Sequence, residues 1–90
     1  RVTFDNESSG RATIIEVFTH DAPGLLYGVS KAVFDAGLSV RSAKIGTYLD
    51  QVVDAFHVTT ADGGRVTDPG LQQSIRTAVE RAVAAAGQPL

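Results

Sequence analysis

The hydrophobic pattern of this chain changes at one turn, and that change constrains which elements can follow. Residues 12–20 (ATIIEVFTH) are rich in β-branched and aromatic side chains, which favours a strand with Ile15 and Val17 on one face. The segment 21–24 (DAPG) ends that strand, because proline and glycine interrupt regular structure. The apolar residues that then follow helical spacing are Leu25, Leu26, Val29, Ala32, Val33 and Ala36. The turn therefore joins a strand to a helix.

A hairpin is expected after this helix. Gly37 stands where a left-handed C-terminal cap would end the helix. Leu38 to Leu49 is a strand candidate whose alternation slips, and a bulge near Arg41-Ser42 would bring both apolar sets to the core. Asp50-Gln51 is the expected hairpin tip, and Val52 to Thr60 returns as a third strand. The apolar residues of that strand that share a face are Phe56 and Val58.

A second helix follows a glycine-rich loop at residues 61–64. Asp68 is a good N-cap, and Pro69 occupies the first helical position. The helix is expected to fray at residues 87–89. Its apolar stripe consists of Leu71, Ile75, Ala78, Val79, Ala82 and Val83.

The resulting β-α-β-β-α order predicts an α+β fold of the ferredoxin-like type, an antiparallel sheet with two helices on one face. Residues 87–90 are too few for the usual final strand. Residues 1–11 are either an extra strand, built on Val2-Thr3-Phe4 in the vacant place, or a disordered linker. Residues 12–86 then form the domain, and residues 87–90 form a tail.

Composition limits the function classes. The chain has 90 residues, which suits one domain, and so small a core would gain from pairing with a second copy. A net charge of −2 gives no basic surface for nucleic acid or an anionic membrane. The absence of cysteine excludes disulfides and thiolate metal sites. Without a signal-peptide or membrane-span pattern, and with arginine at position 1, we expect a fragment of a longer cytoplasmic protein.

Residues that could carry catalysis are sparse. His20 and His57 fall in different strands, with His57 well past the point opposite His20, so each is interpreted as an exposed strand histidine and no metal site is expected. Glu16 and Asp54 could meet across adjacent strands, but two exposed acids need no function to explain them. No nucleophile elbow, phosphate loop or dinucleotide fingerprint occurs. An acylphosphatase-type enzyme would need an arginine in the loop after the first strand, where this chain has Asp21.

The strand-to-helix turn is the one candidate binding site. A helix that begins directly after a tight turn leaves its first amides unpaired, and such a terminus favours a carboxylate. Gly24 permits close backbone approach, and Asp21 could accept hydrogen bonds from a ligand ammonium group. The turn thus suits a free amino acid. The alternative is that Asp21 only caps the helix and nothing binds.

The turn Asp21-x-Pro23-Gly24-Leu25-Leu26 resembles the signature that opens ACT domains, and the order of elements around it agrees. The resemblance covers residues 12–84. Three more segments strengthen it: Gly37-Leu38-Ser39-Val40, Ser42-Ala43-Lys44-Ile45 and Asp54-x-Phe56-x-Val58-Thr59. Phe4-Asp5-Asn6-Glu7 and Thr67-Asp68-Pro69 are similar to the C-terminal ACT domain of bacterial PII uridylyltransferases, which are also uridylyl-removing enzymes.

This resemblance implies a regulatory domain with no catalytic residue, metal or cofactor of its own. It also implies a host enzyme that acts on the PII protein and binds Mg²⁺ only in its catalytic domains. It implies a small amino acid ligand, glutamine first, bound where the turn of one subunit meets the second strand of its neighbour. A homodimer or another ACT–ACT pairing is therefore expected. The implied ligand-binding residues are Asp21, Ala22, Pro23, Gly24, Leu25, Leu26, Ser39 and Val40.

Three of these positions depart from the family pattern. Many relatives carry asparagine where this chain has Asp21 or Ser39, and the uridylyltransferase relatives commonly have arginine where it has Ala22. Losing that charge weakens carboxylate binding or leaves it to the backbone amides alone. Two alternatives therefore stay open: a domain that only dimerises or docks onto its host, and an ACT domain of a different enzyme of amino-acid metabolism.

Overall fold

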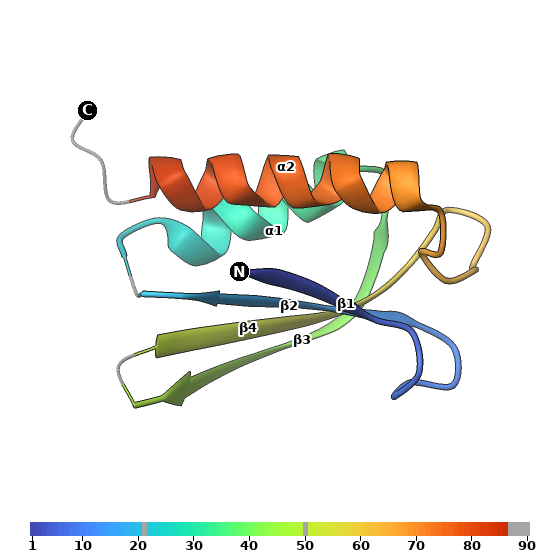
Figure 1. Ribbon diagram of the computed structural model, residues 1–90, viewed down its shortest axis with the longest axis horizontal. Helices are drawn as coiled ribbons and strands as arrows, with labels where there is room; N and C mark the ends of the chain where they lie inside the picture. The colour runs from blue at the N-terminus through green and yellow to red at the C-terminus, as the bar shows by residue number, and fades with distance from the viewer. Residues whose placement is uncertain (21, 50, 87–90) are drawn as a thin grey trace.

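Four antiparallel strands form one sheet in the order β1-β2-β4-β3, and both helices lie on the same face of it (Figure 1). The computed structural model describes residues 1–20, 22–49 and 51–86. The elements are β1 (Val2–Asp5), β2 (Thr13–Thr19), α1 (Leu25–Asp35), β3 (Ser39–Tyr48), β4 (Gln51–Thr59) and α2 (Pro69–Ala85). The predicted ferredoxin-like α+β fold is confirmed.

The core lies between the helices and the two central strands. Alternation along each strand sends every second side chain into this layer, as the sequence predicts for β2 and β4. The buried side chains are Ile15 and Val17 of β2, Val29 and Val33 of α1, Phe56 and Val58 of β4, and Ile75 and Val79 of α2. Leu26 is the exception among the predicted helical residues, because 42% of its surface stays exposed.

The N-terminal segment forms the extra strand, so the linker alternative is wrong. β1 runs antiparallel to β2, with Val2 opposite Val17. Val2 is buried, and the Arg76 guanidinium of α2 lies 5.2 Å from the centre of the Phe4 ring. β1 thereby covers the outer edge of β2 beneath α2 and supplies the fourth strand of the sheet.

The predicted bulge in β3 is present. Val40 pairs with Val58 and Ser42 pairs with His57, so Arg41 is the extra residue. Apolar side chains on both sides of the bulge therefore face the helix layer, although Val40 and Ile45 remain 42% and 56% exposed. Both lie on β3, which is an edge strand of the sheet that the described residues form.

The hairpin between β3 and β4 turns one residue earlier than predicted. Tyr48 pairs with Gln51, which places Gln51 inside β4. Leu49 has a left-handed φ of 58°, as a tight hairpin turn requires. Asp50 lies outside the described residues, as does the expected fraying at 87–89.

The capping residues predicted from the sequence mark the ends of the helices. The Asp68 carboxylate accepts a hydrogen bond of 2.8 Å from the amide of Leu71, and Pro69 opens α2. Gly37 adopts a left-handed φ of 84° after α1. At the other end of α1, Gly24 is the N-cap residue, with φ 77°.

A buried polar network joins the β1–β2 loop to the β4–α2 loop, at the end of the sheet opposite the strand-to-helix turn. Thr13 is fully buried, and its hydroxyl donates to the Asn6 side-chain oxygen while accepting a hydrogen bond of 2.7 Å from the Val66 amide. Asn6 and Gln72 donate in turn to the Val66 carbonyl, at 3.0 and 2.8 Å. The β1–β2 loop and the β4–α2 loop are therefore held together by hydrogen bonds in a dry environment, where such bonds matter most.

Thr13→Val should destabilise the chain because it leaves the buried Val66 amide without its acceptor. We expect a loss of about 2 kcal/mol in the free energy of unfolding, which lowers Tm by roughly 8–16 °C for a domain of this size. Thermal unfolding followed by circular dichroism measures the effect. Thr13→Ser is the control, since it keeps the hydroxyl. Equal losses in the two variants would show that the hydroxyl does not support the loops.

Candidate functional site

Backbone hydrogen bonds hold the helix side of the strand-to-helix turn. The Leu25 amide donates to the Ala22 carbonyl at 3.1 Å, and the Gly28 amide donates to the Gly24 carbonyl at 2.9 Å. Leu25 is 3% exposed, so its side chain belongs to the core and only its backbone can face a ligand. Pro23 and Gly24 are exposed. Asp21 lies outside the described residues, so its predicted role as an acceptor or cap stays a prediction.

The first turn of α1 presents backbone donors. In the described part of the chain, the amides of Leu26 and Tyr27 have no hydrogen-bond acceptor. The first turn also contains no acidic residue that would neutralise the positive end of the helix dipole. This end of α1 therefore has the chemistry that favours a carboxylate.

Ser39 and Val40 lie far from that turn in the same chain. Thr19, where β2 ends before the turn, pairs with Val52, whereas Ser39 pairs with Thr59. Seven residues of β4 separate these pairs, or about 23 Å at the usual rise along a strand. Figure 1 shows the end of β2 at the same end of the sheet as the end of β3 and the start of β4, and the start of β3 at the opposite end. One chain alone does not bring the two halves of the predicted site together.

Several large apolar side chains of α1 and β3 are exposed. Every side chain from Ser39 to Thr47 is exposed. Tyr27 and Phe34 are 73% and 72% exposed, and their spacing of seven residues puts them on the same side of α1. We call the following set the α1–β3 surface: Leu26, Tyr27, Phe34, Val40 and Ile45. Exposed apolar side chains mark an interaction site where they form one patch.

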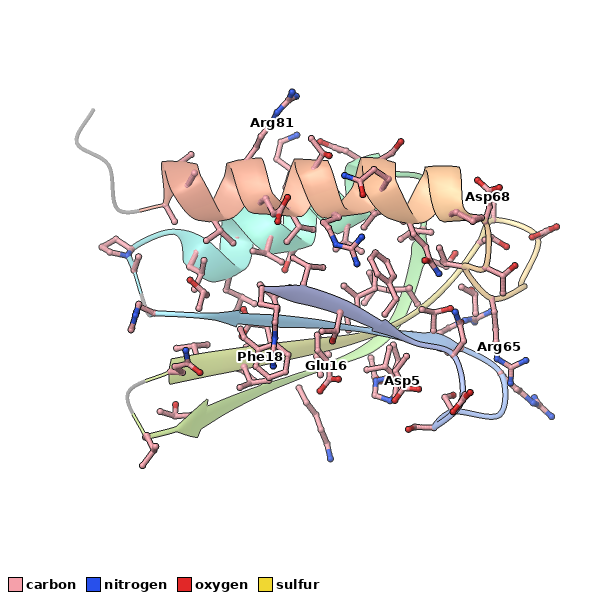
Figure 2. All side chains as sticks on the ribbon, in the orientation of Figure 1. Asp5, Glu16, Phe18, Arg65, Asp68 and Arg81 are labelled. Carbon is pink, nitrogen blue, oxygen red and sulfur yellow. The ribbon has the colours of Figure 1, made fainter. Side chains whose placement is uncertain are left out.

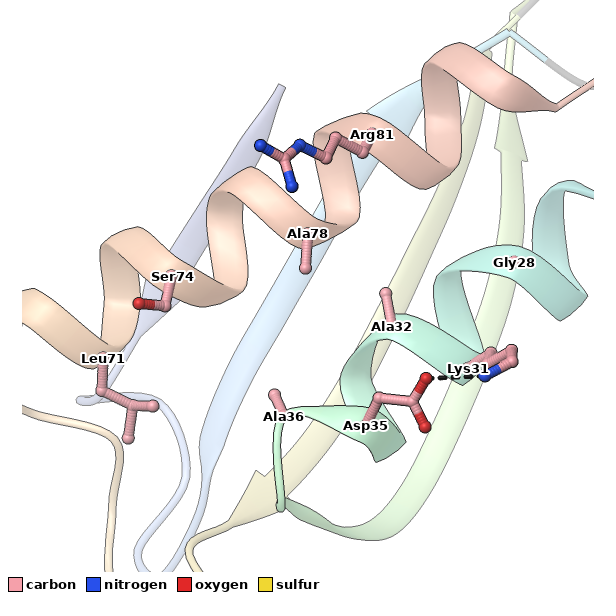
Figure 3. Close-up of a pocket in the computed structure, with 9 residues that line it drawn as sticks. All are labelled: Gly28, Lys31, Ala32, Asp35, Ala36, Leu71, Ser74, Ala78 and Arg81. Carbon is pink, nitrogen blue, oxygen red and sulfur yellow. Dashed lines mark hydrogen bonds and ion pairs between the residues drawn. The ribbon is translucent and has the colours of Figure 1, made fainter.

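A groove of about 450 Å³ lies between α1 and α2 (Figure 3). It is lined by Gly28, Lys31, Ala32, Asp35, Ala36, Leu71, Ser74, Ala78 and Arg81. Lys31 and Asp35 form an ion pair of 2.7 Å at its rim, and the Asp35 carboxylate raises the pKa of Lys31. The groove exists because small side chains face each other where the two helices meet. None of the predicted ligand-binding residues lines it.

The two histidines are far apart, as predicted, but neither is an exposed strand residue. His20 is exposed but follows the end of β2, and His57 lies within β4. His57 pairs with Ile14, six residues before His20. His57 is half-buried, and its Nδ1 atom is shielded from solvent. The interpretation of His57 as an exposed histidine is therefore wrong, because part of its ring is shielded from solvent in the folded chain.

The expectation for the two acids is also wrong. Glu16 pairs with Ala55, and Asp54 pairs with Val17. Because side chains alternate along a strand, Glu16 faces away from the helices (Figure 2), whereas Asp54 faces the helix layer and is 1% exposed. The two carboxylates lie on opposite faces of the sheet and cannot act together.

The described residues offer neither a metal site nor a membrane-spanning helix. No group of three or more histidine, cysteine or acidic side chains there could hold a metal ion. Among the same residues, no helix combines the length and the apolar composition that a membrane crossing requires.

The fold and site together define a class: a small ferredoxin-like α+β domain with an uncovered edge strand and an open helix terminus beside its first turn. Within that class, the chain belongs to the ACT-like domain family. The family model described as "ACR9-like, ACT-like domain" matches residues 1–87.

Curated relatives are similar over most of this chain, and each of three is named a bifunctional uridylyltransferase/uridylyl-removing enzyme. The Caulobacter vibrioides protein is 48% identical over 67 residues, 74% of this chain and 7% of the relative. The Phenylobacterium zucineum protein is 41% identical over 78 residues, 87% of this chain and 8% of the relative. The Erythrobacter litoralis protein is 40% identical over 88 residues, 98% of this chain and 10% of the relative.

The chain thus spans at most a tenth of the length of these relatives. The comparison with solved structures found no significant match.

Proposed function

We propose that this chain is the amino-acid-sensing domain of a bifunctional uridylyltransferase/uridylyl-removing enzyme, and that its ligand is glutamine. The ligand carboxylate would accept hydrogen bonds from the amides of Leu26 and Tyr27, which have no other acceptor among the described residues. Ala22 brings no charge, so the backbone amides would carry this interaction alone. The curated relatives and the ACT-like family support the proposal.

We also propose that two copies of the chain share the amino-acid site, and the uncovered β3 edge is the observation that supports this. An edge strand offers unpaired backbone groups to another strand. If two β3 edges pair antiparallel about a two-fold axis, Ser39 of one copy comes next to the turn end of the other. In this arrangement Ser39 of the second copy completes the site, in place of Ser39 of the same chain, which lies about 23 Å from the turn. It also buries the α1–β3 surface.

Such a shared site would give the domain a regulatory mechanism. A ligand held by two copies binds well only in the paired state, and a ligand shifts an equilibrium by its difference in affinity for the two states. Glutamine would therefore favour the paired arrangement and report nitrogen status to the catalytic domains of the host.

Isothermal titration of the 90-residue chain with glutamine tests the proposal, with sedimentation velocity at the same concentrations. We expect saturable heat at millimolar glutamine or below and one binding event per chain. We also expect glutamine to shift the monomer–dimer equilibrium towards the dimer. Glutamate and alanine are the comparison ligands. Absence of heat with an intact dimer would contradict glutamine sensing and favour a domain that only dimerises.

A domain that dimerises or docks without a ligand is the second candidate, and Ala22 favours it because the turn has no cationic side chain for a carboxylate. The two functions differ in their response to changes at Gly24. A docking domain binds no glutamine, so a bulky residue in the turn would change neither binding nor assembly. In a sensing domain the same change would abolish glutamine binding and the glutamine-dependent shift towards the dimer, while leaving the capacity to pair unchanged.

A further inference from the structure

A second cavity opens on the face of the sheet away from the helices, at the end opposite the strand-to-helix turn. It has a volume of about 520 Å³, which lies in the range of small-molecule sites. We call it the open-face pocket, and its lining residues are Ser9, Arg11, Ala12, Arg41, Ser42, His57, Thr59 and Gly63. None of them belongs to the predicted amino-acid site, so this pocket is separate from the proposed glutamine-sensing function.

The open-face pocket is cationic in a chain whose net charge is −2. Arg11 comes from the β1–β2 loop, and Arg41 is the extra residue of the β3 bulge. Bulges redirect a side chain at the edge of a sheet, and here the bulge places a guanidinium at the pocket. No carboxylate is among the lining residues. Asp62, next to Gly63, is engaged by the Thr60 hydroxyl, which lowers its pKa.

The loop that carries Arg11 is fixed in place. The Arg65 guanidinium donates to the carbonyls of Ser9 and Gly10, at 3.0 and 2.5 Å. Figure 2 shows Arg65 beside this loop. Arg65 belongs to the β4–α2 loop, and the Thr13 network described above holds this loop and the β1–β2 loop together from the core side. The wall of the pocket is therefore built by specific hydrogen bonds, and Arg65 adds a third positive charge near it.

The floor of the pocket contains polar atoms that the described residues do not satisfy. Thr59 is 3% exposed, and its Oγ1 atom has no hydrogen-bond partner among those residues. The same holds for Nδ1 of His57, two residues away on the same face of β4. Buried polar atoms in folded proteins nearly always have partners. Two such atoms at the bottom of a cationic cavity indicate a bound polar group.

We propose that the open-face pocket binds the phosphate group of a small molecule. Guanidinium groups match the oxygens of a phosphate in pairs, so Arg11 and Arg41 would bind it from the rim. The Thr59 hydroxyl would donate from the floor, with Ser9 and Ser42 on the walls. Phosphate carries more charge and more acceptor oxygens than a carboxylate, which suits two arginines and several hydroxyls. The free ion and a phosphate monoester share this chemistry.

Amide proton–nitrogen NMR of the 90-residue chain at constant ionic strength tests the proposal, with inorganic phosphate and uridine monophosphate as separate probes. We expect saturable shifts at Ser42, His57 and Thr59 and none at the turn. Tighter binding of the nucleotide would identify a monoester as the ligand, and equal binding would identify the phosphate ion. The absence of saturable shifts with both probes would overturn the proposal, as would equal binding of glutarate.

Variants separate binding from folding. Arg11→Gln and Arg41→Gln should each weaken phosphate binding at least about tenfold, as expected for the loss of a hydrogen bond to a charged group. Arg81→Gln on α2 removes the same charge away from the pocket (Figure 2) and should leave binding unchanged. Thr59→Val should raise Tm, because it removes a buried unsatisfied hydroxyl, and at the same time weaken binding. Equal losses in the Arg81 variant, or unchanged binding in Thr59→Val, would contradict the assignment.

Discussion

Phe34→Lys is expected to convert the paired chain into a monomer. Phe34 is 72% exposed and belongs to the α1–β3 surface, so a folded monomer can accept lysine at this position. Across a two-fold axis, each substitution occurs twice in the interface, so two charges would be buried without partners. We expect the dimer dissociation constant to rise at least about a hundredfold, which corresponds to roughly 2.7 kcal/mol. Sedimentation velocity over a concentration series measures it.

The same variant links assembly to ligand binding. If the amino-acid site is shared by two copies, Phe34→Lys should also lose glutamine binding, although it leaves the turn intact. Ala61→Lys is the matched control, because it adds the same charge on the exposed β4–α2 loop. A wild-type chain that sediments as a monomer at high concentration would contradict the shared site, as would a Phe34→Lys dimer of unchanged affinity.

Gly24→Val is expected to abolish amino-acid binding at the turn. Gly24 has a φ of 77°, a conformation in which a β-branched residue is strained by roughly 1–3 kcal/mol. A Cβ atom would meet nothing within 4 Å, so the effect comes from the backbone and not from a clash. The turn would relax to another conformation and move the amides of Leu26 and Tyr27. Because both proposed donors move together, we expect at least about a hundredfold weaker glutamine binding by isothermal titration.

Gly10→Val is the control for this experiment, since it adds the same side chain in open space without a left-handed φ. It should bind glutamine as the wild type does. Sedimentation of Gly24→Val should show a normal dimer, because the α1–β3 surface is unchanged. Normal glutamine binding by this variant would place the ligand elsewhere and remove the turn from the site.

The elements of this fold were predictable because each is determined by local pattern. Period-two alternation predicts the buried faces of β2 and β4, and Asp68-Pro69 and Gly37 mark helix ends through their own backbone preferences. The bulge at Arg41 was also predictable, because the apolar alternation slips by one residue there. Errors of one residue, as at Gln51, arise where a turn can form in two adjacent registers.

The geometry of the sites was only partly predictable. The sequence indicates that Gly24 precedes a helix, and it marks Ser39 as a polar residue after the helix-end glycine, but it does not show that about 23 Å separates the turn from Ser39 in one chain. That separation follows from the antiparallel order β2-β4-β3. The burial of Asp54 likewise depends on which face of β4 the helices cover.

The sequence by itself determined the turn, the order of elements and the family, because these depend on residues close together along the chain. Only the tertiary structure decided that Arg11, Arg41 and Thr59 share one pocket, since strand register joins segments up to 48 residues apart. It also decided that Thr13 holds Val66 and that β3 is left as an uncovered edge. The physical reason is that hydrophobic period and backbone preference are local, whereas register, burial and charge clustering are set by contacts between distant segments.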